Sequence, residues 1–354
     1  MLMRLISKIG FIGLFIVNFW MMTSCQPDEI GPQSSDDPTD SISDFTNGVF
    51  VVNEGNFTWG NGSLSFYAPD EKKSYNHLFE MINDYPLGDV PQSIRKGKYD
   101  YCLSVNNSNS VIFCDFQMKV KKEFNGVNSP RYSTEDDDGN VYISSLYGSQ
   151  LLKINKERTT IDTISQFDEW TEDILWKDDY LYLIQKRFGE SDSLYKNRLY
   201  KLADSGKKLD SIVIGQDISG MRLISNDRLA VLSHTEEKSK LWLVNLANFS
   251  VEKKEISGKA SFLAFSASKQ QLYYFKDGIY SWDLATKEEK LIKEITGKNC
   301  YGFNVDALRS EFYIGDAKDF ISKGDLLRYD IDGLLLDSTQ LSIIPGQIYF
   351  EHNL

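Results

Sequence analysis

Residues 48–67 read GVFVVNEGNFTWGNGSLSFY, and this stretch indicates how the rest of the chain is built. A β-branched and aromatic run at 49–52 is followed by a polar and aromatic loop at 53–60, and then by an alternating polar and apolar run at 63–67. Such runs favour strands, and the Asn61 and Gly62 pair before the second run is a strong turn signal. We therefore predict a hairpin whose loop carries an acid, two amides and two large aromatic side chains.

The hairpin pattern returns along the chain at a nearly constant interval. Short apolar runs recur whose central residues, mostly tyrosines, lie 41, 40, 48, 43 and 40 positions apart. These central residues are Tyr101, Tyr142, Tyr182, Ala230, Tyr273 and Tyr313. A loop and a second run ending in Asn or Asp follow, as in LWLVN at 241–245. A period near 40–45 residues with four strands per unit is typical of a β-propeller, because one such sheet cannot cover both its faces.

Counting the repeats from the first hairpin gives seven blades. The first blade has no innermost strand of its own, because its run at 49–52 follows the N-terminal segment directly. Residues 345–352 follow a complete seventh blade and supply the missing strand. We predict an all-β fold over residues 45–354, a seven-bladed β-propeller closed by pairing the C-terminal strand with the first hairpin, which removes free sheet edges. Two separate β domains are the alternative. The one helical period lies at 77–83.

The N-terminal segment predicts export and a lipid anchor. Residues 1–24 have a basic start and an apolar core at 9–22, which is shorter than the roughly 20 residues of a membrane span and reads as a signal peptide. The residues before Cys25 resemble the lipobox of bacterial lipoproteins, so we expect lipidation at Cys25; a plain signal peptide with a chance cysteine is the alternative. Residues 25–44 are rich in Pro, Ser and Asp and predict a flexible tether. Their acidic start resembles the signal that sends Bacteroidota lipoproteins to the cell exterior.

Composition and motifs argue against several classes of function. The net charge of −12, from 39 Lys and Arg against 51 Asp and Glu, disfavours nucleic acid. The three histidines, His77, His234 and His352, are too scattered for a metal cluster or a histidine-activated nucleophile. Residues 136–140 (DDDGN) resemble part of a calcium loop but lack its final glutamate, so they read as a hairpin turn. We expect no enzyme, no metal and no cofactor.

The cysteines of the predicted domain carry little functional signal. Cys102 and Cys114 fall on the two strands of one predicted hairpin, near opposed positions. A disulfide between them is sterically conceivable, but we favour two buried thiols. Cys300 stands alone.

Loops predicted to open on one face of the ring carry the candidate site. In a propeller, the loops between second and third strands and the segments leading into each innermost strand open on the same side. Here they hold aromatic side chains, amides and arginines, the combination that ligand and partner sites use. The candidate ligand-binding residues are Glu54, Asn56, Phe57, Trp59, Arg131, Tyr132, Tyr147, Trp170, Arg187, Phe188 and Tyr301. Packing between blades is the alternative role, above all for Tyr132 and Tyr301.

Four stretches resemble a known family. Residues 53–57 (NEGNF), 62–65 (GSLS), 86–93 (PLGDVPQS) and 129–132 (SPRY) look like the YncE-like propeller lipoproteins of Bacteroidota, which include surface cobalamin-binding lipoproteins (BtuG). The resemblance is specific over roughly 48–150. It implies a seven-bladed propeller, a TonB-dependent outer-membrane transporter as partner, and cobalamin or another corrinoid as ligand rather than cofactor.

We therefore expect a lipid-anchored outer-membrane protein, facing the cell exterior, that captures a scarce small-molecule nutrient and delivers it to a transporter. A corrinoid is the first candidate, and capture of a siderophore or glycan on the same scaffold is the alternative. An enzyme such as a lactonase or lyase would need axial metal ligands or a histidine. A protein-scaffolding role is the remaining alternative.

The anchor prediction is tested by changing the cysteine. Cys25→Ala should release the protein from the membrane or leave it unprocessed, because lipid attachment needs the thiol. In intact cells, added protease should remove the unmutated protein; its survival, with the protease shown to be active on a known surface protein, would contradict surface exposure.

Overall fold

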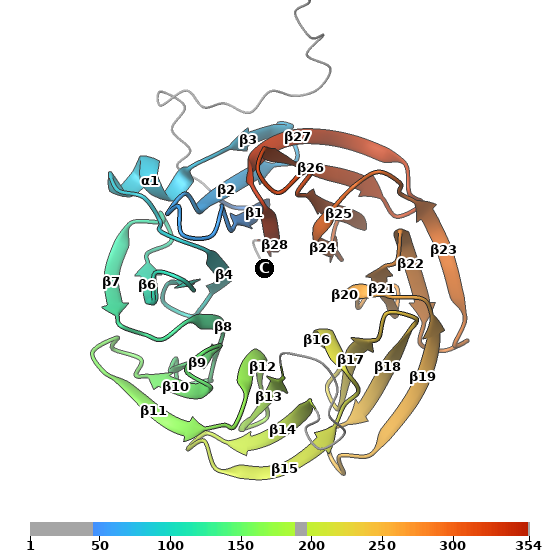
Figure 1. The fold of residues 1–354 in the computed structure, drawn as a ribbon, viewed down its shortest axis with the longest axis horizontal. Helices are drawn as coiled ribbons and strands as arrows, with labels where there is room; N and C mark the ends of the chain where they lie inside the picture. The colour runs from blue at the N-terminus through green and yellow to red at the C-terminus, as the bar shows by residue number, and fades with distance from the viewer. Residues whose placement is uncertain (1–44, 188–196, 353–354) are drawn as a thin grey trace, which may run out of the picture. The chain divides into compact units, whose positions relative to one another are not determined.

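The described residues fold as a ring of sheets. The computed structural model describes residues 45–187 and 197–352, which form seven antiparallel sheets of four strands each. The sheets are arranged as blades around a central axis (Figure 1). This confirms the predicted all-β, seven-bladed propeller. Cys25, the tether and Phe188 lie outside the described residues.

The strands follow one order in every blade, from the innermost outward. Blade 1 contains β28 (Pro345–Glu351), β1 (Gly48–Asn53), β2 (Ser63–Ala68) and β3 (Lys73–Tyr75). Blade 2 contains β4 (Pro91–Lys96), β5 (Tyr101–Val105), β6 (Ser110–Cys114) and β7 (Val120–Asn125). Blade 3 contains β8 (Pro130–Glu135), β9 (Val141–Ser145), β10 (Gln150–Ile154) and β11 (Ile161–Gln166). Blade 4 contains β12 (Trp170–Lys177), β13 (Tyr180–Lys186), β14 (Arg198–Ala203) and β15 (Lys208–Val213).

The remaining three blades continue the pattern. Blade 5 contains β16 (Asp217–Ser225), β17 (Arg228–His234), β18 (Lys238–Asn245) and β19 (Val251–Ser257). Blade 6 contains β20 (Ser261–Ser266), β21 (Gln271–Phe275), β22 (Gly278–Asp283) and β23 (Glu289–Glu294). Blade 7 contains β24 (Cys300–Asp306), β25 (Glu311–Asp316), β26 (Lys323–Asp330) and β27 (Leu335–Ile343). Over the described residues one short helix forms, α1 (Leu78–Asn83), where the helical period was found, and no helix of this part is long and apolar enough to cross a membrane.

Strand β28 closes the ring, as predicted. It pairs antiparallel with β1, with Val49 opposite Phe350 and Val51 opposite Ile348. The N-terminal and C-terminal ends of the propeller therefore share one sheet, and blade 1 has the same four strands as the others.

The hydrophobic core lies between the blades. Buried apolar side chains of the described residues form seven clusters, and each cluster joins two neighbouring blades. The recurrent central residues found in the sequence are all buried in second strands; Tyr142, for example, stacks on Trp176 of the next blade at 5.8 Å between ring centroids. Because each sheet buries its faces only against its neighbours, no blade has a complete core alone.

Register explains the free cysteines. Cys102 pairs with Phe113, and Cys114 pairs with Tyr101, so the two cysteines are one position out of register. Successive residues of a strand point to opposite faces. The thiols accordingly lie in different clusters, one between blades 2 and 3 and one between blades 1 and 2, and both are buried and unbridged.

The acidic run at 136–140 forms a turn between β8 and β9, as predicted. Asp136 accepts hydrogen bonds from the backbone N–H groups of Asp138 and Asn140 and from the Tyr142 hydroxyl. The carboxylate that resembled a calcium ligand therefore stabilises the hairpin.

Closure predicts the effect of removing the last strand. Deleting residues 345–354 should give insoluble protein, because it exposes the edges of β1 and leaves the apolar cluster beneath β28 open to water. Soluble yield and thermal melting measure this. A chain shortened only by residues 353–354 is the control, because the β1 and β28 pairing ends at Glu351. A soluble deletion variant with unchanged melting would contradict the ring closure.

Candidate functional site

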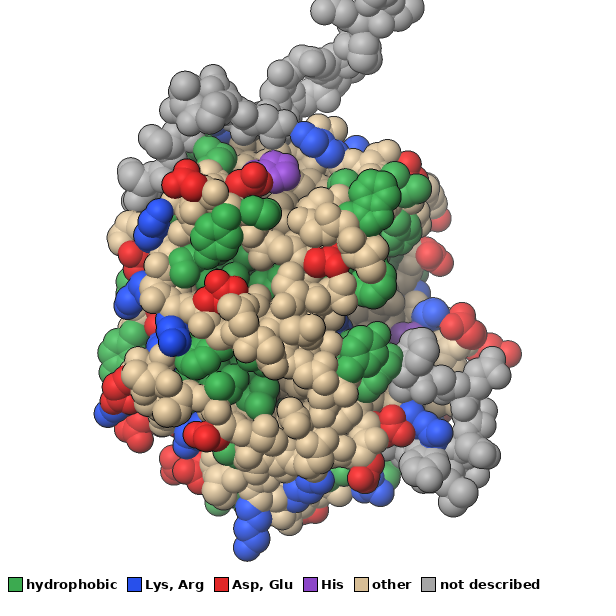
Figure 2. Space-filling view, turned by 60° about the vertical axis from the view of Figure 1, so that its left-hand side comes forward, with side chains coloured by type: hydrophobic (Ala, Val, Ile, Leu, Met, Phe, Trp, Pro, Cys, Tyr) green, Lys and Arg blue, Asp and Glu red, His purple; other side chains and the backbone are tan. Residues whose placement is uncertain are grey.

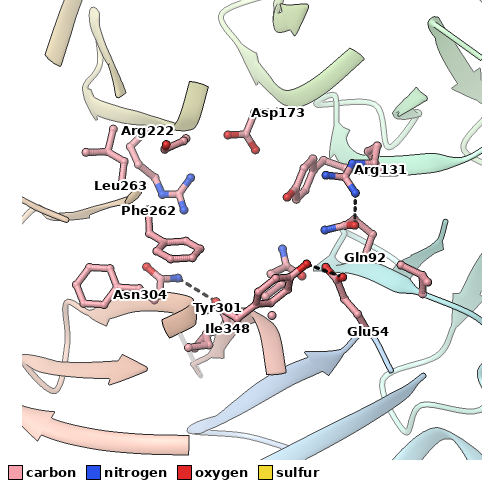
Figure 3. Close-up of a pocket in the computed structure, with 18 residues that line it drawn as sticks. Glu54, Gln92, Arg131, Asp173, Arg222, Phe262, Leu263, Tyr301, Asn304 and Ile348 are labelled. Atoms are coloured by element: carbon pink, nitrogen blue, oxygen red, sulfur yellow. Dashed lines mark hydrogen bonds between the residues drawn. The ribbon is translucent and has the colours of Figure 1, made fainter. Parts of the chain in front are cut away.

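The innermost strands surround a channel along the central axis. Its upper chamber, at the end where these strands begin, has a volume of about 380 Å³ and is lined by all seven blades (Figure 3). Its lower chamber, of about 310 Å³, lies further along the same strands. The two chambers share Tyr132, Asp173, Arg222, Asn304, Gln347 and Ile348, so they are parts of one channel.

A bulge near the start of every innermost strand supplies lining side chains, and in β28 it releases Gly346 and Gln347. The pairing of β4, β8, β12, β16, β20 and β24 with the adjacent strand skips one or two residues there. With those of β28, the skipped residues that line the upper chamber are Gln92, Arg131, Tyr132, Asp173, Ser219, Phe262, Tyr301, Gly346 and Gln347. A bulge releases a residue from the ladder and re-aims its side chain. Phe262 has φ of 54°, a left-handed conformation that is rare for a phenylalanine and is often found at functional sites.

One wall of the upper chamber is a hydrogen-bonded group. The Tyr301 hydroxyl donates to Glu54 Oε2 at 2.8 Å. Arg131 donates from Nε and Nη2 to both carboxylate oxygens of Glu172, at 3.0 and 3.3 Å, and from Nη1 to Gln92 Oε1. Figure 3 shows Glu54, Gln92 and Arg131 side by side. Burial raises the pKa of the Glu54 carboxyl, against the lowering effects of Tyr301 and Arg131.

The facing wall combines a cation with apolar side chains. Arg222, Phe262 and Leu263 lie across the cavity from Glu54 (Figure 3). Arg222 Nη1 donates to the Met221 carbonyl at 2.8 Å, and the Met221 N–H donates to Asp173 Oδ2 at 3.0 Å. Burial raises the pKa of the Asp173 carboxyl, opposed chiefly by the positive charge of Arg222.

Loops at the rim of this face expose large aromatic side chains. Phe57 is 65% exposed, Trp59 74% and Tyr147 61%, far more than packing between blades would leave. The loop holding Trp59 is fixed by hydrogen bonds from the Thr58 N–H to Asp89 and from Asn56 Nδ2 to the Phe320 carbonyl. In Figure 2 hydrophobic side chains form several separate groups, divided by polar surface.

The predicted site residues thus fall into two sets. Glu54, Arg131, Tyr132 and Tyr301 line the upper chamber. The other described members stand outside the chamber on loops or strand ends; these are Asn56, Phe57, Trp59, Tyr147, Trp170 and Arg187. Tyr147 packs edge-on against Trp170 at 5.5 Å, and Arg187 lies 3.6 Å from a Glu169 oxygen.

Sequence reasoning identified four of the 18 residues that line the upper chamber. Those it missed include Gln92, Asp173, Arg222, Phe262, Asn304 and Gln347. The segments leading into the innermost strands were expected on the site face; two of them, 219–222 and 301–304, lie within strands β16 and β24. Those segments contain Arg222 and Asn304, so the right stretch of sequence was identified but its role as channel wall was not. Over the described ranges, no group of three His, Cys, Asp or Glu side chains could hold a metal ion.

Comparisons with known proteins establish the fold and no more. No family model and no curated protein matches the sequence. A quinonprotein alcohol dehydrogenase-like protein from Bacteroides thetaiotaomicron VPI-5482 is 15% identical, with a TM-score of 0.68 over 86% of this chain and 78% of that chain. A streptogramin B lyase is 12% identical, with a TM-score of 0.58 over 73% and 86%. The computationally designed protein Ika8 is 9% identical, with a TM-score of 0.59 over 86% and 88%. Such identities show a shared fold, which hosts unrelated functions.

The raised pKa of Glu54 predicts a pH-dependent effect of Glu54→Gln. A carboxyl with a raised pKa in the folded state contributes stability that is present below its unfolded pKa and is lost as the pH rises through the folded pKa. The glutamine side chain is neutral at every pH, and its amide oxygen can still accept the hydrogen bond from the Tyr301 hydroxyl. The melting temperature of Glu54→Gln minus that of the unmutated protein should therefore increase between pH 4 and pH 8.

Glu172→Gln is the matched control for that series. It leaves the Arg131 guanidinium without its carboxylate, so melting at neutral pH should fall, by an unfolding free energy of about 2 kcal/mol. If the melting-temperature difference between Glu54→Gln and the unmutated protein stays constant or shrinks as the pH rises, Glu54 is already ionised at low pH in the folded protein.

Proposed function

We propose that this propeller is a non-catalytic binding protein that captures a large amphipathic small molecule on the rim above its channel. The observation that carries the proposal is the exposure of Phe57, Trp59 and Tyr147 on the face where the channel opens. Three large aromatic side chains are exposed on this one face, and aromatic side chains are common anchors of binding sites.

A corrinoid is the first ligand to test. The resemblance of residues 48–150 to surface cobalamin-binding lipoproteins suggests it, and the chemistry of the rim is compatible with it. A corrinoid is broad and flat, with apolar faces and polar amides at its edge, so it would lie across the rim rather than enter a chamber of about 380 Å³. Aromatic rings would contact its faces, while Asn56 and Arg187 would offer hydrogen bonds at its edge.

The same proposal includes location and partner. The lipobox-like sequence at Cys25 supports anchoring in the outer membrane with the propeller outside the cell. A captured ligand must then be passed on, and the resemblance suggests a TonB-dependent transporter as the recipient. The acidic net charge of −12 supports a role away from nucleic acid.

A ligand screen tests the proposal directly. Thermal shift should be measured with cobalamin, cobinamide and ferric siderophores, because a ligand that binds only the folded state raises its melting temperature. We expect a shift with a corrinoid at micromolar concentration. If only ferric siderophores raise the melting temperature, the ligand is a siderophore and not a corrinoid. If none of these ligands raises it, protein scaffolding is favoured over nutrient capture.

Trp59→Ala should separate binding from folding. Loss of this central aromatic anchor should weaken corrinoid affinity by about thirtyfold, or about 2 kcal/mol, while melting hardly changes because the indole is 74% exposed. Trp242→Ala is the matched control, since Trp242 is 5% exposed and its Nε1 donates to Ser233 at 2.8 Å. Trp242→Ala should have a lower melting temperature, and its folded fraction should bind the corrinoid with unchanged affinity. The reverse pattern would mean that the rim aromatics serve packing.

A further inference from the structure

The lower chamber contains two arginines that have no carboxylate partner. Arg95 of β4 and Arg222 of β16 both line it, from blades on either side of the central axis (Figure 1). Among the described residues, no carboxylate oxygen lies within 4.0 Å of either guanidinium, in a protein with 51 acidic residues. The contrast is with Arg131, Arg158 and Arg328, each of which is paired with a carboxylate.

Hydrogen-bond donors in this chamber are left unmatched. Arg95 Nε is buried and has no acceptor within the described part of the chain. Gln347 accepts the Ile94 N–H at 2.6 Å through Oε1, which fixes its amide and leaves its NH₂ group as a donor in the chamber wall. Buried N–H groups are almost always paired, so an orphaned guanidinium nitrogen needs a physical explanation.

Among the described lining residues of the lower chamber, one carries a carboxyl group, and the other side-chain acceptors are neutral hydroxyl and amide oxygens. Asn304 uses both ends of its amide on the backbone, donating to the Ile348 carbonyl and accepting from the Val305 N–H, both at 2.9 Å. Asp173 is the one lining residue of the lower chamber that is acidic, and one of its oxygens already accepts the Met221 N–H. Two arginines therefore face one carboxyl group, and the chamber has an excess of donors and of positive charge.

We infer that the lower chamber binds a small oxyanion, a carboxylate or a phosphate, between Arg95 and Arg222. A guanidinium offers planar paired donors that match carboxylate and phosphate oxygens and remains charged at any physiological pH. An anion there would accept from the guanidinium groups of Arg95 and Arg222 and from the Gln347 amide, and it would balance the second positive charge. This site is distinct from the rim and does not rest on the function proposed for the rim.

Isothermal titration of the full-length protein with sodium succinate and with inorganic phosphate tests the inference, in chloride buffer and without any rim ligand. The unmutated protein should bind at least one of the two anions, saturably and with one site per chain. Arg222→Gln and Arg95→Gln should each weaken that binding at least tenfold, because each removes a charged donor pair. Preference for succinate or phosphate identifies which oxyanion the chamber takes.

Arg198→Gln on β14 is the matched control, because Arg198 lies outside both chambers and bonds to Ser211 of the same blade. It should leave anion affinity unchanged. Absence of saturable heat up to about 10 mM of either anion, a range that covers even weak sites, would overturn the inference. So would equal affinity in Arg222→Gln and the unmutated protein. If Arg222→Gln does not fold, Arg222→Lys takes its place; it keeps the positive charge but lacks the paired planar donors, so its anion affinity should be intermediate. Arg95→Gln then tests the second arginine.

Discussion

Each blade of this propeller is buried only by its neighbours, and the pairing of β28 with β1 makes that arrangement complete. An open row of seven blades would leave the outer face of its first and last blades and the unpaired edges of β1 and β28 in water. The interface between blades 7 and 1 buries those faces, and the pairing of β28 with β1 removes those edges. The same pairing builds the site. Strand β28 contributes Gln347 and Ile348 to both chambers, and the backbone N–H of Glu54 donates to the Ile344 carbonyl at 2.9 Å. Stability and site geometry therefore depend on one strand.

Chemical character changes along the channel axis. The rim presents exposed aromatic rings, the upper chamber is lined by Arg131, which is paired with Glu172, and the lower chamber adds Arg95 to the Arg222 and Asp173 that line both chambers. The rim, the upper chamber and the lower chamber therefore offer a ligand different interactions, namely apolar contact, hydrogen bonding and attraction of an anion. The proposals for the rim and for the lower chamber are accordingly independent, and either can fail without the other.

The repeat could be predicted because apolar and polar residues alternate within each strand and the apolar runs recur at a nearly constant spacing. Tyr142, Tyr182 and Tyr273 fall in second strands as expected, since a strand that packs between blades must place large apolar side chains at fixed positions. The side of the ring on which the candidate loops and the upper chamber lie also follows from strand order alone. Lipidation of Cys25 and the contribution of Phe188 remain predictions.

The channel wall could not be predicted for a physical reason. Alternation assigns each residue of a strand to one of two faces, and a bulge inserts a residue that breaks the count. Asp173 and Phe262 are such inserted residues, so their direction depends on a local backbone kink that composition does not encode. The Cys102 and Cys114 pair shows the same limit, because a shift of one residue decides whether two thiols meet.

The bulges also bear on how such a protein can change over evolutionary time. A residue that the ladder skips makes no cross-strand pair, so replacing its side chain leaves the sheet's pairing intact. Substitutions at skipped residues that make no ion pair, such as Ser219, can thus alter the wall of the upper chamber without disturbing strand pairing. Exchanging skipped residues over evolutionary time would change the chemistry of the channel wall while the sheets that hold them stay the same.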